Sequence, residues 1–282
     1  MKKLRPLQQQ QRPGKESPLN PQSLTAPIEY PPEGKLFGKV ALISGADSGI
    51  GKAVALLFAK EGADIAFCYL SETEDAKDTK ALVEAYGRKC MMRKTDLSKE
   101  QNCKTFIQDV YDYYGQIDIL INNAALHWEA ESIEEISTEQ FDHTFKNNMY
   151  AYFWMTKYTM PYLKAGAAIV NTTSVTAYRG SDHLMDYAAS KGAIVAWTRS
   201  LAQNLAKQNI RVNAVAPGPI WTPLIASSFG PEHNATFGSE QPMGRAGMPY
   251  EVAPSFLFLA SEDSSYITGQ ILHPNGGESI NG

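Results

Sequence analysis

The sequence has few cysteines, and their spacing argues against two common uses. Only Cys68, Cys90 and Cys103 occur among the 282 residues, an odd number without a CxxC pair. This pattern fits neither a disulfide framework nor a zinc site. We therefore expect buried, reduced thiols, no bound metal and a cytoplasmic location.

Long apolar runs and sustained basic stretches are also missing. No run reaches the roughly 18 apolar residues that a membrane helix requires, so no membrane association is expected. The net charge is −4 and both signs are spread along the chain, which does not indicate a nucleic-acid partner. The expected partner is a small molecule.

Residues 1–36 lack a hydrophobic period and are rich in Gln, Pro and Ser. We expect a flexible or extended arm there, and an arm that wraps a partner subunit remains an alternative. Across the whole chain, 43% hydrophobic and 20% charged residues are typical of a globular protein with a core. Residues 37–282 are predicted to form one domain.

From Lys39 onward, short apolar runs alternate with longer amphipathic stretches, which predicts a single doubly wound α/β domain with a seven-stranded parallel sheet of Rossmann type. The strands are expected at Val40–Ser44, Ile65–Leu70, Cys90–Lys94, Ile117–Ile121, Ala168–Thr172, Arg211–Ala214 and Gln270–His273. The helices are expected at Gly49–Glu61, Glu74–Tyr86, Lys99–Tyr114, Thr138–Leu163, Met185–Lys207 and Tyr250–Leu259. The interruption from Pro217 to Pro249 has the composition of a mobile loop or lid.

A glycine-rich turn follows the first expected strand and opens the first expected helix. It spells Ser44-Gly45-Ala46-Asp47-Ser48-Gly49-Ile50-Gly51. Glycines allow a ligand to approach the backbone, and free amides at a helix N-terminus favour a pyrophosphate. A tight strand-helix connection without a ligand remains the structural alternative.

Tyr187 and Lys191 lie one helical turn apart, and Ser174 precedes Tyr187 by thirteen residues. An i, i+4 spacing places the ammonium close to the phenol. A fixed positive charge favours the tyrosine anion and would lower its pKa, so Tyr187 could act as a general acid or base. With 14 tyrosines in the chain the pair alone is weak evidence, because such a spacing also arises by chance.

The motifs taken together resemble the short-chain dehydrogenase/reductase family. Its Thr-Gly-x-x-x-Gly-x-Gly element matches residues 44–51 with Ser44 in place of Thr, and the resemblance covers residues 38–282. Further matching elements are Asp96-Leu97, Asn122-Asn123-Ala124-Ala125, Asn148, Ser174, Tyr187/Lys191, Pro217-Gly218-Pro219-Ile220-Trp221-Thr222 and Asn275-Gly276-Gly277. Asn122-Asn123-Ala124-Ala125 departs from the family's usual ending in Ala-Gly.

The resemblance implies hydride transfer between NAD(P)(H) and an alcohol or carbonyl substrate. Tyr187 would exchange the proton, Ser174 would position the oxygen, Lys191 would act on Tyr187 and the cofactor ribose, and Asn148 would hold a water. Cofactor contacts are expected from Gly45, Asp47, Ser48, Gly49, Ile50, Gly51, Tyr69, Asp96, Leu97, Asn123, Ala124, Ala125, Tyr187, Lys191, Pro217, Gly218, Ile220 and Thr222. For Asn148, a buried amide that kinks its helix remains the alternative.

The cofactor prediction favours NAD(H) over NADP(H). Tyr69 stands where an acid would bind the ribose of NAD, no positive charge follows at Leu70 or Ser71, and Asp47 would repel a 2′-phosphate. Acceptance of either cofactor through the hydroxyls of Tyr69 and Ser71 remains an alternative.

Within the family, the glycine turn and the Pro-rich arm look like the branch of glucose/ribitol dehydrogenases and aldehyde reductases, which suggests a small polyol, sugar or aldehyde. The resemblance also implies a homotetramer. A catalytically silent dinucleotide-binding scaffold or redox sensor, and a non-redox reaction on the same fold, remain alternatives. His127, His143, His183 and His233 are scattered without metal spacing, so no role is assigned to them.

Overall fold

The fold comes from a computed structural model. It describes residues 25–280 without a gap, together with residues 6, 8–10, 16, 20, 21 and 23. The chain divides into two compact units, Met1–Tyr30 and Pro31–Gly282. Much of the arm expected over residues 1–36 lies outside the described residues. Within the second unit, the backbone N–H groups of Lys35 and Leu36 donate to Glu61, and Leu36 is buried.

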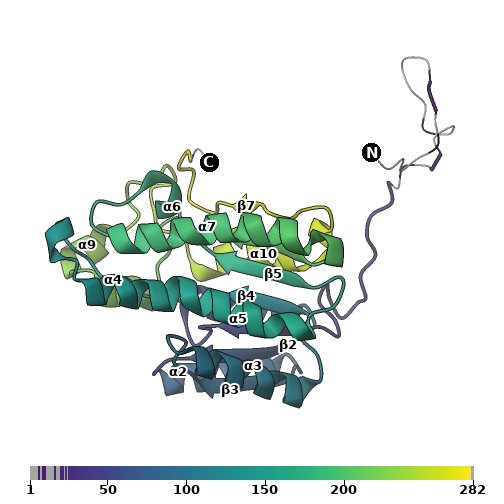
Figure 1. The fold of residues 1–282 in the computed structure, drawn as a ribbon, viewed down its shortest axis with the longest axis horizontal. Coiled ribbons are helices and arrows are strands. Elements are labelled where there is room, and N and C mark those ends of the chain that lie inside the picture. The colour runs from purple at the N-terminus through teal and green to yellow at the C-terminus, as the bar shows by residue number, and fades with distance from the viewer. Residues whose placement is uncertain are drawn as a thin grey trace. The chain divides into compact units, whose positions relative to one another are not determined.

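Seven parallel strands form one sheet in the second unit, which confirms the predicted fold class. They are β1 (Val40–Ser44), β2 (Asp64–Tyr69), β3 (Cys90–Lys94), β4 (Ile119–Asn122), β5 (Ala168–Thr172), β6 (Arg211–Val215) and β7 (Ile271–Leu272). Their order is β3-β2-β1-β4-β5-β6-β7 (Figure 1). The winding direction reverses between β1 and β4, where open α/β sheets bind their ligands.

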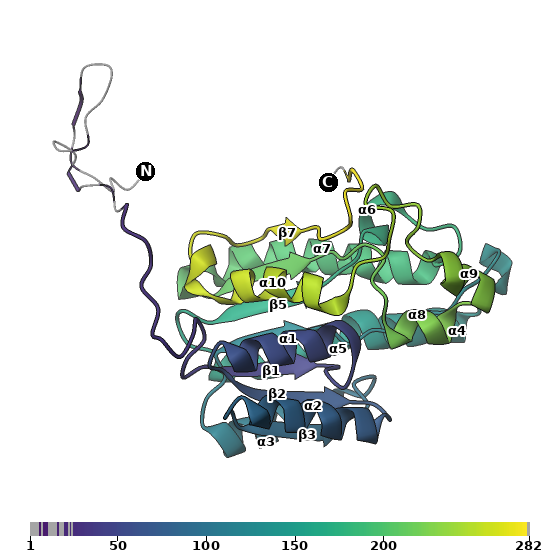
Figure 2. The same cartoon turned by 180° about the vertical axis from the view of Figure 1, so that it is seen from behind.

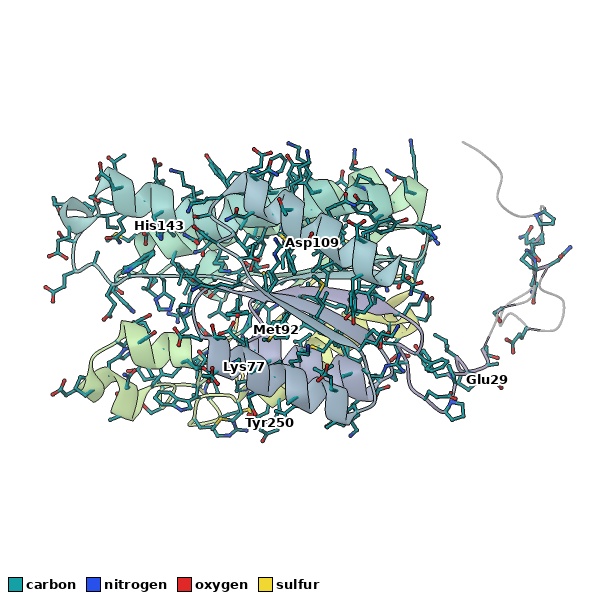
Figure 3. The ribbon with its side chains drawn as sticks, turned by 90° about the horizontal axis from the view of Figure 1, so that it is seen from below. Glu29, Lys77, Met92, Asp109, His143 and Tyr250 are labelled. Atoms are coloured by element: carbon teal, nitrogen blue, oxygen red, sulfur yellow. The ribbon has the colours of Figure 1, made fainter. Side chains whose placement is uncertain are left out.

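Helices cover both faces of this sheet. The longer ones are α1 (Gly49–Lys60), α2 (Thr73–Ala85), α3 (Glu100–Tyr114), α4 (Thr138–Phe145), α5 (Ala151–Thr159), α7 (Met185–Leu205) and α10 (Pro249–Ala260). Figure 1 shows α3, α5 and α7 in front of the sheet, and Figure 2 shows α1, α2 and α10 on the other face. Figure 3 shows Lys77 of α2 and Asp109 of α3 on opposite sides of Met92 in β3.

Two cores result from the alternation of side chains along each strand. Ile43 packs with Phe58 of α1 and Phe256 of α10, whereas its neighbour Leu42 packs with Phe106 of α3 on the other face. All five are fully buried. The apolar strand runs in the sequence therefore reflect burial on both faces.

The helix expected over Thr138–Leu163 is present from Thr138 to Tyr162, but its type changes along its length. A five-residue π-helix, Lys146–Tyr150, separates α4 from α5. Phe145, Met149 and Tyr152 keep a three- to four-residue spacing across this segment, so the hydrophobic period did not reveal the change of helix type. π-helical turns are frequent at functional sites, and this one contains Asn148.

The segment from Pro217 to Pro249 is more ordered than the predicted loop. It contains α8 (Pro223–Ser228) and α9 (Pro231–Thr236), each with a proline in its first turn. These helices lie beyond the carboxyl ends of the strands (Figure 2). A third short helix, α6 (Thr176–Arg179), follows β5 closely.

Candidate functional site

The glycine turn joins β1 to α1 with little room for side chains. Gly45 and Gly49 have positive φ angles of 68° and 55°. A Cβ on Gly51 would lie 1.9 Å from the carbonyl oxygen of Gly45, so only glycine fits there. At the carboxyl end of β1 the turn therefore exposes backbone groups and the N-terminus of α1, which suits a pyrophosphate.

The end of β4 is tied to this turn by side-chain hydrogen bonds. Ser44 Oγ accepts from the backbone N–H of Asn123 at 2.8 Å and of Ala124 at 3.2 Å. Asn123 Nδ2 donates to the carbonyl oxygen of Gly45 at 2.8 Å. The hydroxyl of Ser44 thus has a structural use in the position where the related family has threonine.

Ser174, Tyr187 and Lys191 meet where β5 ends and α7 begins. Ser174 Oγ accepts hydrogen bonds from Thr176 N at 3.2 Å and Thr176 Oγ1 at 3.0 Å, and its side chain also hydrogen-bonds to Tyr187. Lys191 Nζ lies 5.4 Å from the Tyr187 ring centroid and donates to Thr172 O at 2.9 Å. The three side chains predicted from spacing are therefore neighbours in space.

Burial dominates the acid-base properties of this group. It raises the pKa of Tyr187 to about 12, against the lowering effect of the hydrogen bond with Ser174, and it lowers the pKa of Lys191 to about 7. The direction for Tyr187 is opposite to the depression expected from Lys191. The reason is that desolvation disfavours both charged forms, so the lysine carries less positive charge at neutral pH than an exposed ammonium.

Asn148 is fully buried in the π-helix and its amide is well paired. Its Nδ2 donates to Leu126 O at 2.9 Å and to Ser190 Oγ at 3.1 Å, and its Oδ1 accepts from Leu126 N at 2.9 Å. Both amide N–H groups are occupied by protein. The side chain thus joins the end of β4 to α7, and a water bound by Asn148 would have to use one of its oxygens.

The segment after β6 closes over the glycine turn. Gly218 allows close packing, because a Cβ there would lie 2.7 Å from Cα of Asn275. At the start of α8, Cγ2 of Thr222 lies 3.3 Å from where a Cβ of Gly49 would be. Residues far apart in the sequence therefore form one continuous wall.

These elements enclose a cavity of about 1050 Å³, large enough for a dinucleotide and a small substrate. Most of the predicted site residues line it, namely Gly45, Asp47, Ser48, Gly49, Ile50, Tyr69, Leu97, Asn123, Ala124, Ala125, Ser174, Tyr187, Lys191, Pro217, Gly218, Ile220 and Thr222. The predicted residues outside this lining are Gly51, Asp96 and Asn148. The carboxylate of Asp96 accepts from Ser98 N and Oγ at 3.0 and 2.6 Å, within its own loop.

Three histidines that the sequence left without a role also line the cavity: His127, His183 and His233. The His127 ring makes edge contacts with Tyr187 at a centroid distance of 5.1 Å and packs 5.4 Å from Phe229. His127 is buried, and its Nδ1 has no hydrogen-bond partner among the described residues. An unpaired buried nitrogen costs about 1–3 kcal/mol, so His127 requires an explanation.

The described residues lack two other features, a metal-binding cluster and a membrane helix. Within the described part of the chain, no group of three or more His, Cys, Asp or Glu side chains could hold a metal ion. No helix described there has the length and apolar character needed to cross a membrane. Cys68, Cys90 and Cys103 are free and buried, and burial raises the pKa of each thiol to about 12.

Comparison with known proteins agrees with this geometry. A family model described as Enoyl-(Acyl carrier protein) reductase matches residues 45–279. The chain is 49% identical to the NADPH-dependent aldehyde reductase 1, chloroplastic, of Arabidopsis thaliana, with 97% of each chain covered. It is 47% identical to the glucose and ribitol dehydrogenase of Daucus carota, covering 98% of this chain and 97% of the relative.

A solved structure shows the same fold. The short-chain dehydrogenase from Burkholderia cenocepacia in complex with NADP is 32% identical and superposes with a TM-score of 0.81, covering 86% of this chain and 98% of that one. The glycine turn, the neighbouring Ser, Tyr and Lys side chains and the enclosing cavity are those expected for a nicotinamide dinucleotide. The chain is therefore an oxidoreductase that uses such a cofactor, and it belongs to the short-chain dehydrogenase/reductase family.

Proposed function

We propose that this oxidoreductase interconverts a small aldehyde, sugar or polyol with its redox partner, and that Tyr187 transfers the proton. One observation carries the proposal. Ser174, Tyr187 and Lys191 are neighbours, and they line the same cavity as the glycine turn. The names of the two relatives, an aldehyde reductase and a glucose and ribitol dehydrogenase, support the substrate class.

In the proposed mechanism the residues of the glycine turn, with Asn123 and Thr222, hold the dinucleotide. When bound, the cofactor supplies or removes the hydride. During reduction, Tyr187 donates its proton to the carbonyl oxygen of the substrate. Ser174 accepts two hydrogen bonds from Thr176, which fixes its own hydrogen as the donor to the Tyr187 hydroxyl. With substrate bound, this hydrogen would turn to the substrate oxygen beside Tyr187 and stabilise the charge that develops there.

For Lys191 we propose a supporting role. Its Nζ is anchored on Thr172 O at 2.9 Å in full burial, which fixes its position relative to Tyr187. Because burial lowers its pKa to about 7, it can exchange a proton at neutral pH. After Tyr187 has given its proton to the substrate, Lys191 would supply a new proton to Tyr187.

We also propose a preference for NAD(H) over NADP(H). Asp47, Glu72 and Asp75 line the same end of the cavity as Tyr69. Burial raises the pKa of Asp47, and the nearby Asp75 and Glu72 raise it further, which indicates a concentration of negative charge. A 2′-phosphate would be repelled there. Two of the similar proteins named above point the other way, because the aldehyde reductase of Arabidopsis thaliana is NADPH-dependent and the dehydrogenase from Burkholderia cenocepacia was solved with NADP, so the preference needs a direct test.

The remaining proposals concern the whole protein. Family membership supports a homotetramer, and the three buried free thiols fit a reducing compartment such as the cytoplasm. The arm expected over residues 1–36 is proposed to be separate from the catalytic domain only up to Tyr30, because Pro31–Leu36 belong to the second unit. A screen of aldehydes, ketones and sugars with NADH and NADPH in parallel tests the function. We expect stoichiometric cofactor oxidation with small aldehydes or sugars. Cofactor binding without turnover of any carbonyl would instead indicate the silent scaffold.

A further inference from the structure

The part of the cavity that would hold the substrate has a wall rich in histidine and phenylalanine. Beyond Tyr187, the cavity is lined by His127, His183, Phe229, His233 and Phe237. Phe229 lies at the centre of this group, with its ring centroid 4.3 Å from that of His233 and 5.4 Å from that of His127. The wall therefore combines aromatic surface with imidazole nitrogens that can donate or accept hydrogen bonds.

His127 is the member of this wall nearest to the proposed proton donor. Its ring meets the Tyr187 ring edge-on at 5.1 Å, and only 6% of its surface is exposed. Its Nδ1 is completely shielded and unpaired among the described residues. Buried polar atoms nearly always have a partner. A ligand in the cavity can reach this ring only through its other nitrogen, Nε2, which is not among the shielded atoms and has no hydrogen bond to a described residue.

The charge state of His127 restricts what that partner can be. Burial, assisted by the nearby positive charge of Lys191, lowers its pKa to about 4, so the ring is neutral at pH 6–8. A neutral imidazole has one donor and one acceptor nitrogen. The accessible nitrogen is a donor in one tautomer and an acceptor in the other, so a hydroxyl group, which can both donate and accept, suits it in either, whereas a carboxylate or phosphate can only accept.

We propose that His127 is a specificity-determining residue that hydrogen-bonds to a hydroxyl group on the carbon next to the reacting carbon. The position follows from the contact with Tyr187, whose hydroxyl meets the reacting oxygen under the proposed function, on which this inference rests. The C–H groups of such a substrate would pack against Phe229 and Phe237. The preferred substrates are then α-hydroxy aldehydes and vicinal diols, including sugars and polyols, rather than plain aldehydes.

The test compares substrates that differ only by this hydroxyl. For the full-length protein, kcat/KM is measured for 2-hydroxypropanal against propanal and for glycolaldehyde against acetaldehyde, with free carbonyl concentrations determined by NMR. We expect the hydroxylated member of each pair to be preferred by about fivefold or more, the size of one net hydrogen bond. Equal values within both pairs would overturn the proposal.

Variants separate the hydrogen bond from the general effect of changing the wall. In His127→Leu the preference is expected to fall to about one, mainly through a higher KM for the hydroxylated substrate, whereas His127→Gln retains part of it. The control is His143→Leu on α4, an exposed histidine outside the cavity lining (Figure 3), which should keep the wild-type preference. A loss that is equal for both substrates in His127→Leu would mean that the residue only maintains the fold.

A second readout does not depend on turnover. With the reduced cofactor bound, an alcohol cannot be oxidised, and propane-1,2-diol is expected to shift the NMR signal of the His127 ring whereas propan-1-ol does not. Identical shifts would contradict the inference. If none of the aldehydes supports oxidation of NADH or NADPH, the proposed function itself fails. Equal kcat/KM values within each substrate pair would contradict only the role of His127.

Discussion

At the scale of single residues, Tyr187 is the group on which the proposed chemistry depends most. Replacing it with phenylalanine removes the transferable proton but keeps the ring that packs against His127. We expect Tyr187→Phe to lower kcat by about 100-fold or more while leaving cofactor binding, measured by fluorescence titration, near the wild-type level. Tyr162→Phe is the matched control, because its hydroxyl bonds only to the exposed side chain of Gln108. Unchanged turnover in Tyr187→Phe would disprove the mechanism.

Replacing Asp47 tests whether its negative charge determines the preference for NADH over NADPH. Asp47→Asn removes one of the negative charges near the expected 2′-position of the ribose, so it should shift the ratio of kcat/KM for NADPH over NADH upward. We expect a shift of about tenfold, equivalent to ~1.4 kcal/mol. Asp112→Asn on α3 serves as a control that changes the net charge equally but does not line the cavity. An equal shift in the control would show that only overall charge matters.

The low pKa of the buried His127 ring leads us to expect a pH dependence of the free energy of unfolding. Its pKa is about 4 in the folded protein and about 6.5 in an unfolded chain. Between these values the unfolded chain binds more protons, so acidification from pH 7 to 4.5 should lower the free energy of unfolding by about 2–3 kcal/mol through this residue. In His127→Gln the fall in urea stability should be smaller by that amount. Equal falls in both proteins would mean that His127 does not titrate as a buried neutral ring.

The residues found from sequence and those missed differ in a physical way. Gly45, Tyr187 and Lys191 could be located because a local backbone turn or one helical turn brings their groups together. His127, His183 and His233 could not, because they come from three segments that meet only when α8 and α9 fold over the sheet edge. The unpaired nitrogen of His127 has no signal in the sequence.

At the scale of elements, α10 ends against a buried arginine of β6. Arg211 Nη1 donates to Leu259 O and Ser264 Oγ, both at 2.6 Å, and its Nη2 donates to Ser261 O at 3.0 Å. Cations at a helix C-terminus interact favourably with its carbonyl groups. This contact joins the last long helix to the sheet.

We therefore expect Arg211→Met to lower the free energy of unfolding by about 2–4 kcal/mol, because carbonyl groups would be left buried without donors. Arg211→Lys keeps the charge but has fewer donors, and should lose less. Urea unfolding followed by circular dichroism gives both values. Wild-type stability in Arg211→Met would show that water replaces the guanidinium at no cost.

Element prediction failed where hydrophobic periodicity gives no information. The apolar residues Phe145, Met149 and Tyr152 keep a helical spacing across the π-helix of Lys146–Tyr150, so the pattern over Thr138–Leu163 indicated a single α-helix. Helices α8 and α9 have six residues each, too few to repeat the helical period of 3.6 residues twice, although Pro223 and Pro231 at their starts are typical of helix N-termini. The seven strands were found within one to two residues because short stretches with apolar residues alternate with longer amphipathic ones.

At the scale of the whole molecule, the arm and the assembly can be tested together. We expect the full-length protein to have a mass in light scattering four times the chain mass of 31.0 kDa. Deletion of residues 1–30 leaves the second unit intact, so unfolding midpoint and specific activity should stay near wild type. A fall to a smaller assembly after this deletion would favour the alternative in which the arm wraps a partner subunit.

The cavity also links ligand binding to protein synthesis. Its first wall residue is Gly45, yet the segment at Gly218 is held by contacts from the far end of the chain, including the bond from Gly218 N to Pro274 O at 3.1 Å and the packing of Asn275. A nascent chain on the ribosome therefore cannot complete this wall until nearly all of its residues have emerged. Because a ligand stabilises only the state that binds it, the cofactor should stabilise finished chains and give little protection to incomplete ones.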